Sequence, residues 1–109
     1  MELLTVHTNV QDLTMVMKLK GTLDISTSHV IDPYLAKIEE IHKLLIDFSE
    51  LEFIDSTGIG SIMSAIYLSK EKGFKLVFAG VDDITHHVFE TVGLYQIMEA
   101  LQEGEEECI

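Results

Sequence analysis

Hydroxyl, carboxylate and glycine residues are concentrated in one short segment, Asp55 to Ser61. Ser56 follows Asp55 directly, and Gly58 and Gly60 come soon after. An apolar pattern with helical spacing starts at the same place, so we expect Ser56 where a helix begins. Free backbone N–H groups and the positive end of the helix dipole converge at such a position. A phosphoryl group on the Ser56 hydroxyl would be accommodated there at modest cost to the fold.

The simpler interpretation is that Ser56 only caps the helix, as serine often does. Asp55 could supply the same cap, and the local pattern leaves both interpretations open. Gly58 and Gly60 have no side chain, so another protein could approach the backbone closely there. We also expect the helix face opposite the core to be small, uncharged and suited to docking a partner. Its members are Ser61, Ser64, Ala65 and Leu68.

Motifs for other chemistries fail at identifiable positions. A dinucleotide fingerprint would need glycine where Met63 stands, and the segment lacks the lysine of a P-loop. Neither Ser56 nor Ser61 has the flanking glycines of a nucleophile elbow. His86 and His87 are adjacent, so they point to different sides of a helix and cannot bind one metal together. We therefore expect no enzyme activity, no metal and no cofactor, although nucleotide binding stays open.

The composition is typical of one globular domain that carries a strongly acidic surface. The chain has 109 residues, of which 47% are hydrophobic, and its net charge is −12. Such a charge repels phosphate backbones, so we expect no direct nucleic-acid binding. The sequence has no apolar run of bilayer length and no secretory signal pattern, which predicts no membrane association and a cytoplasmic location. The single Cys108 is consistent with an exposed thiol in a reducing compartment.

Strands are expected to alternate with helices after an opening hairpin. The predicted strands are 3–8, 14–20, 43–48 and 75–79, with a polar turn after the third. The first two are close enough in sequence to pair as an antiparallel hairpin. Leu44 to Ile46 is apolar on both faces, which predicts a central strand covered by a layer on each side.

Two helical patterns lie between these strands, and a third follows the last strand. The first has apolar residues from 30 to 41, and Pro33 inside it means either that the regular helix begins at Asp32 or that the first turn is irregular. The second starts in the serine segment and stops at Gly73. The third is capped by Asp82 or Asp83, and its apolar positions, four residues apart, are Ile84, Val88 and Val92. A short strand or turn near Ile97 and a helical end to about Leu101 are expected to complete the fold.

Several blocks of the chain resemble the STAS domain family. They are Gly-Thr-Leu-Asp at 21–24, Leu-Ile-Asp-Phe at 45–48, Phe-Ile-Asp-Ser-Thr-Gly-Ile-Gly at 53–60, and Val-Gly-Leu at 92–94. They are most similar to the stand-alone bacterial anti-sigma factor antagonists. The resemblance implies an α/β fold with a small mixed sheet flanked by helices. We assign a single STAS-like domain to residues 1–102, and the run of glutamates after it indicates an acidic C-terminal tail at 103–109.

The resemblance also implies a role in the regulation of transcription. In this family the unmodified antagonist binds an anti-sigma factor that is itself a serine kinase, and thereby frees a sigma factor. The kinase would phosphorylate Ser56, and a serine phosphatase would reverse the modification. Asp24 and Asp55 match acidic positions beside that serine, and Thr57 lies in the same block. The predicted partner-binding residues are Asp24, Asp55, Ser56, Thr57, Gly58, Gly60, Ser61, Ser64, Ala65 and Leu68.

The same domain also occurs in scaffold assemblies, transporter tails and lipid-transport complexes, some of which lack phosphorylation. The alternative is therefore a scaffold subunit of a larger signalling or transport assembly without a phosphate cycle.

Overall fold

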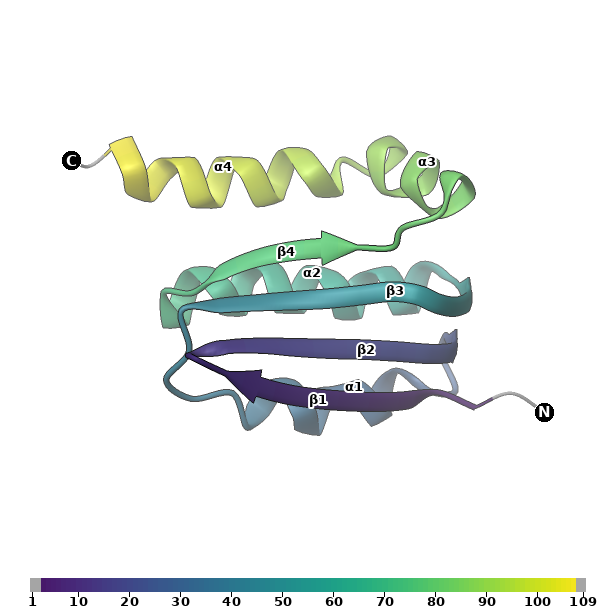
Figure 1. Ribbon diagram of the computed structural model, residues 1–109. Helices are drawn as coiled ribbons and strands as arrows, with labels where there is room; N and C mark the ends of the chain where they lie inside the picture. Colours follow the sequence, from purple (N-terminus) through teal and green to yellow (C-terminus); the bar gives the residue numbers. More distant parts are fainter. Residues whose placement is uncertain (1–2, 108–109) are drawn as a thin grey trace.

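A four-stranded mixed sheet forms the centre of the molecule (Figure 1). The structure is a computed structural model, and it describes residues 3–107. Strand β1 pairs antiparallel with β2, and β2, β3 and β4 are parallel to one another. This arrangement confirms the predicted hairpin and the α/β class. The strands, in their spatial order, are β1 (Thr5–Gln11), β2 (Thr14–Leu23), β3 (Lys43–Ile54) and β4 (Lys75–Ala79).

Helices cover one face of this sheet and continue past the β4 edge. Helices α1 and α2 lie behind the sheet in Figure 1, while α3 and α4 follow β4. Within residues 3–107, no helix covers the opposite face. The helices are α1 (Ser28–Ala36), α2 (Ser56–Lys72), α3 (Asp83–Thr91) and α4 (Leu94–Glu107). The predicted boundary at residues 102 and 103 falls within α4, and Cys108 lies outside the described residues.

The core lies between the helices and one face of the sheet. Met17 and Leu19 of β2, together with Leu44 and Ile46 of β3, are fully buried, as their alternation predicts. Leu45 points to the other side of β3 and is only half-buried. The expectation of a layer on each side of this strand is therefore wrong, because the helices pack on one side alone.

Strand β3 is also longer than expected. It continues through Ile54, whereas the polar residues after Phe48 had suggested a turn. Its pairing with β2 shifts register twice, between Lys18 and Lys20 and again after Gly21. Such bulges place extra residues on one strand without ending the ladder. The polar stretch therefore stays within the strand, and β3 delivers the chain directly to the start of α2.

Helix α1 excludes one of the two alternatives for Pro33, namely that the regular helix begins at Asp32. It begins at Ser28, so the proline lies in its second turn, where it is exposed. The helix ends at Ala36, and Ile38 and Ile41 are buried by the loop that follows. A short helix tolerates the missing proline N–H because the core contacts of Ile31 and its neighbours hold it against the sheet.

The end of the chain differs most from expectation. Phe89 is the buried residue of α3, whereas Ile84 and Val92 are exposed, so the predicted apolar stripe is wrong. The reason is an aromatic cluster in which the ring of Phe89 lies 5.7 Å from Phe48 and 5.8 Å from Phe78. Ile97 lies in α4 rather than in a strand or turn.

Gly58 sets how closely α2 approaches the sheet. It is buried, and a Cβ at this position would lie 2.3 Å from the carbonyl oxygen of Leu23 and 2.8 Å from the side chain of Ile54. A Cβ on the exposed Gly60 would meet nothing within 4 Å. Gly58 is therefore required by the chain's own packing, and its interpretation as a point of approach for a partner is wrong.

We predict that Gly58→Ala destabilises the fold by about 1–3 kcal/mol, because the methyl group must push α2 away from the end of β2. Gly60→Ala is the matched control, and its higher helix propensity should stabilise the fold by up to about 1 kcal/mol. Urea denaturation of both variants measures the difference. Equal unfolding free energies of the two variants would show that the close contact at Gly58 does not contribute to stability.

Asp82 is the residue that caps α3, which decides between the two predicted candidates. Its carboxylate accepts a hydrogen bond of 2.7 Å from the backbone N–H of Thr85. Hydrogen bonding by Thr85 holds the pKa of Asp82 below its ordinary value, because it stabilises the ionised form.

We predict that this cap weakens in acid. A carboxyl group with a lowered folded-state pKa stabilises the fold above its unfolded pKa of about 3.9, and the contribution is lost as pH falls through the folded value. Asp82→Asn retains a cap that does not titrate. Below about pH 4, the unfolding free energy of the wild type should therefore decrease relative to that of Asp82→Asn. A difference that stays constant from pH 7 to pH 3 would contradict the assignment.

Candidate functional site

Ser56 is the first residue of α2, and its side chain is exposed. The residue before it, Asp55, has extended backbone angles and caps the helix, because its carboxylate accepts a 2.9 Å hydrogen bond from the N–H of Gly58. The interpretation of Ser56 as the cap is therefore wrong. Its hydroxyl lies in solvent at the start of the helix, without the capping role.

The second carboxylate oxygen of Asp55 connects α2 to the loop between β2 and α1. It accepts a 3.2 Å hydrogen bond from the N–H of Ile25. The backbone N–H of Asp55 itself donates to the carbonyl of Leu23 at 3.2 Å. One carboxylate thus holds two segments that are thirty residues apart in sequence. Asp55 is a structural part of the site as well as a charge beside the serine.

Asp24 organises the same loop from within. Its carboxylate accepts hydrogen bonds from the hydroxyl of Ser26 at 2.7 Å and from the N–H of Ser26 at 2.9 Å. The buried hydroxyl of Thr27 accepts from the N–H of Asp24 at 2.9 Å and donates to the carbonyl of Thr22. These bonds, led by that of the Ser26 hydroxyl, lower the pKa of Asp24 below its ordinary value. Asp24 therefore carries its negative charge throughout the physiological range.

The sheet brings these two carboxylates to the same place as the serine. Strands β2 and β3 run parallel, with Leu23 opposite Ile54, so the residues that follow both strands meet at one edge. The predicted proximity of Asp24 and Asp55 to Ser56 thus has a structural basis in the parallel register. Thr57 is half-buried in the first turn of α2.

The predicted docking face of α2 is only partly accessible. Ser61 is 7% exposed and Ala65 is fully buried, so their placement on an open face is wrong. Helix α2 lies between α1 and α4 and contacts both, and small residues allow this close packing on its flanks. Ser64 remains exposed, with its hydroxyl donating to the carbonyl of Gly60 at 3.2 Å, and Leu68 is half-buried against the core.

Two exposed apolar residues at the same end of the sheet as the serine were not predicted. Ile25 lies in the loop that Asp55 holds, and Phe53 lies in β3 two residues before that carboxylate. Their side chains are 76% and 55% exposed, respectively. An isoleucine within the polar run from Asp24 to Ser28 was the available signal, because nothing in that loop pattern calls for an apolar residue.

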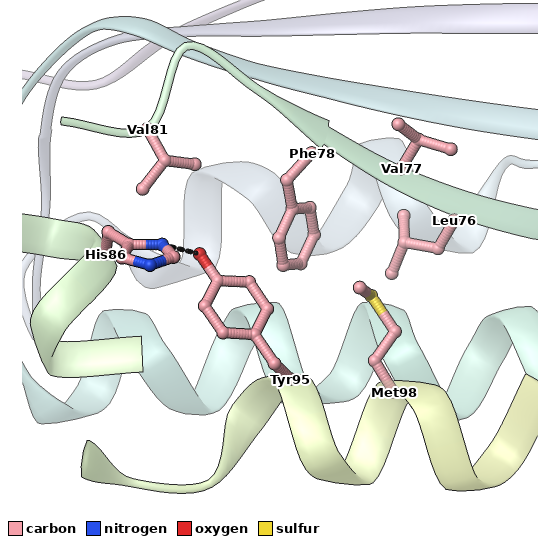
Figure 2. A pocket seen from close by; sticks show the side chains of 7 residues that line it. All are labelled: Leu76, Val77, Phe78, Val81, His86, Tyr95 and Met98. Carbon is pink, nitrogen blue, oxygen red and sulfur yellow. Dashed lines mark hydrogen bonds between the residues drawn. The ribbon is translucent and has the colours of Figure 1, made fainter. Parts of the chain in front are cut away.

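A separate shallow pocket of about 480 Å³ lies between β4 and the two last helices (Figure 2). None of the predicted site residues lines it. At one end the Nδ1 atom of His86 and the hydroxyl of Tyr95 form a 3.0 Å hydrogen bond, and Met98 and Leu76 lie at the other. Burial, and secondarily the charge of Glu90, raises the pKa of Tyr95 above its ordinary value. The pocket is lined mainly by apolar side chains and lacks a reactive group beyond this pair.

The described residues were compared with the requirements of a metal site and of a membrane-spanning helix. No group of three or more His, Cys, Asp or Glu side chains there has a geometry that could hold a metal ion. None of the helices in that part of the chain combines the length and the apolar character needed to cross a bilayer.

Comparison with known proteins identifies similar sequences and folds. The STAS domain family model matches residues 5–108. The anti-sigma-B factor antagonist of Listeria monocytogenes is 32% identical over 87 residues, which cover 71% of this chain and 76% of that protein. The phosphorylated form of the Bacillus cell fate determinant SpoIIAA aligns with a TM-score of 0.68 and 20% identity, covering 85% of this chain and 86% of the other.

A transporter-related protein has the same fold. The crystal structure of a sulfate transporter family protein from Wolinella succinogenes aligns with a TM-score of 0.71 and 20% identity, covering 85% of this chain and 75% of the other. The blocks around Asp24 and Ser56, the mixed sheet and the family match over nearly the whole chain agree with one another. The chain belongs to the STAS domain family.

Proposed function

We propose that this protein is an anti-sigma factor antagonist whose binding is switched off by phosphorylation of Ser56. The unmodified form binds an anti-sigma factor that is also a serine kinase, and so releases a sigma factor in the cytoplasm. The observation that carries the proposal is the exposed Ser56 hydroxyl at the start of α2, next to a carboxylate that already caps the helix. The name of the Listeria relative, an anti-sigma-B factor antagonist, supports the same role.

The position of Ser56 suits a modification that leaves the fold intact. Because the side chain is exposed and Asp55 supplies the cap, a phosphoryl group displaces no hydrogen bond that the helix start needs. The first-turn N–H groups and the helix dipole favour negative charge at this end. A kinase and a phosphatase could therefore act on the folded protein. The phosphorylated form of SpoIIAA, which has a similar fold, is consistent with this.

The same charge would end a protein contact. A phosphoserine brings about −1.5 to −2 charges to a point beside Asp55. In a contact that excludes water, these charges must be paired or the complex weakens. Each ~1.4 kcal/mol lost weakens binding tenfold, so a few kcal/mol suffices to release the partner. The accessible members of the predicted surface, Gly60 and Ser64, together with Asp24 and Thr57, would lie in or near that contact.

A second candidate function is a scaffold subunit or a transporter-associated domain without a phosphate cycle. The similarity to the sulfate transporter family protein of Wolinella succinogenes favours this candidate. Size-exclusion chromatography with light scattering separates the two functions. A stable large homo-oligomer would favour the scaffold, whereas a small species that forms a complex with an anti-sigma factor would favour the antagonist.

We predict that Ser56 is the residue phosphorylated by the cognate anti-sigma kinase with ATP. Ser56→Ala should bind the kinase with an affinity close to that of the wild type and should take up no phosphate. Ser56→Asp should bind at least tenfold more weakly, because it places a charge in the contact. Mass spectrometry locates the phosphate and calorimetry measures the affinity.

The control for this experiment is Thr57→Ala, which alters the neighbouring hydroxyl and should still be phosphorylated. Phosphate found on Thr57 or Ser64 would move the site. Wild-type affinity in Ser56→Asp would refute the switch.

A further inference from the structure

Two exposed apolar residues, Ile25 and Phe53, lie at the end of the sheet where α2 begins. The N–H of Ile25 donates to the carboxylate of Asp55, the residue before Ser56, which fixes the loop beside the helix start. Phe53 pairs with Thr22 across the sheet and precedes Asp55 by two residues. A single exposed apolar residue is ordinary in a soluble protein. Two large ones at the end of the sheet that also presents the exposed Ser56 favour a surface that is buried in a complex.

Charge is distributed unevenly around this pair. The parallel strands β2, β3 and β4 end at one edge of the sheet, which we call the acidic edge because each strand is followed there by carboxylates. The carboxylates are those of Asp24, Asp55, Asp82 and Asp83.

None of the seven basic residues of the chain lies at the acidic edge. Lys18 and Lys20 lie within β2, where both form ion pairs with Glu50. The other lysines lie where the parallel strands begin or where α1 and α2 end, which is the opposite side of the molecule (Figure 1). They are Lys37, Lys43, Lys70, Lys72 and Lys75.

We propose that the acidic edge and its apolar pair form the docking surface for a protein that presents an apolar recess rimmed by lysine or arginine. This inference rests on the proposed function, because it specifies the chemistry of the partner at the Ser56 site. Ile25 and Phe53 enter the recess and supply affinity through buried apolar area. The carboxylates face the basic rim and set orientation and association rate.

This surface chemistry excludes two other occupants. A second copy of the chain would bring one acidic edge against another, and like charges in a contact cost energy. A nucleic acid would bring phosphates against the same carboxylates. Ser56 lies at the same end of the sheet as Ile25 and Phe53, so a phosphate on it would enter the proposed contact. There the dianion would have to lose its water beside carboxylates, which would release the partner.

The first experiment tests the surface without any natural partner. The full chain, labelled with ¹⁵N, is titrated with an amphipathic helical peptide of leucine and lysine, and separately with the same peptide in which glutamate replaces lysine. The lysine peptide should shift amide resonances at 24–26, 53–56 and 82–84, and the glutamate peptide should not. Shifts confined to other residues, such as those of the pocket or of α4, would overturn the inference. Equal shifts with both peptides would also overturn it.

The second experiment uses the anti-sigma kinase of the source organism. Ile25→Ser and Phe53→Ser should each weaken binding at least tenfold. Val10→Ser is the matched control, because Val10 is 53% exposed on β1 near the β1–β2 turn, where β2 starts and away from the acidic edge. Its affinity should stay within twofold of wild type. Ile25 lies in a loop, so its variant remains informative even if Phe53→Ser folds poorly. Replacing Asp82 and Asp83 together by asparagine should lower the association rate and flatten its dependence on salt.

These outcomes separate the two proposals. If wild type binds the kinase and the Ile25 and Phe53 variants bind equally well, the docking surface is refuted and the antagonist function stands. If wild type does not bind the kinase, the antagonist function fails, and the peptide titration alone decides whether the surface has the stated chemistry.

Discussion

The carboxylate of Asp55 is the interaction on which the arrangement of this site depends. One oxygen closes the first turn of α2 and the other holds the loop after β2. Both bonds require the helix to start very close to the end of β2, and Gly58 permits this because any side chain there would meet the carbonyl of Leu23. A single acidic residue and a single glycine thus fix where the exposed hydroxyl of Ser56 lies relative to the sheet.

The packing of α2 also fixes the position of its N-terminus. The helix lies between α1 and α4, and its buried surface includes the small residues Ser61, Ala65 and Ser69 as well as the large Ile62 and Ile66. A helix held on both flanks and against the sheet cannot pivot about its first turn. Its N-terminus is therefore a rigid platform, and charge added at its exposed end acts on what touches the surface rather than on the helix itself.

Much of this arrangement could be predicted from local patterns. The hairpin, the parallel strands and the start of α2 follow from alternation, spacing and the turn residues around them. The proximity of Asp24 and Asp55 to Ser56 was expected from the family resemblance alone, and the parallel register of β2 and β3 supplies its physical basis. Ser56 could be placed because the helical pattern of α2 starts at its segment, whereas the extension of β2 and β3 to Leu23 and Ile54 was not foreseen.

The errors share a physical cause. The periodicity of apolar residues identifies the buried face of a helix or strand only when a single neighbouring layer covers that element. Ser61 and Ala65 were predicted to lie on an exposed face of α2, because the sequence does not show that α1 and α4 pack against the flanks of this helix. Phe89 replaced Ile84 in the core because the aromatic cluster with Phe48 and Phe78 outweighs a regular stripe. The polar residues after Phe48 stayed in β3 because bulges absorbed them. Each of these outcomes depends on contacts between elements far apart in sequence.

The separation of the cap from the exposed hydroxyl has an evolutionary consequence. Asp55 and Gly58 carry the architecture, while Ser56 contributes little to it, so position 56 can change without loss of the domain. A lineage can therefore gain, modify or abandon regulation at this residue while selection on folding acts elsewhere. The same scaffold is then free to persist in proteins as different as a sigma-pathway antagonist and a sulfate transporter family protein.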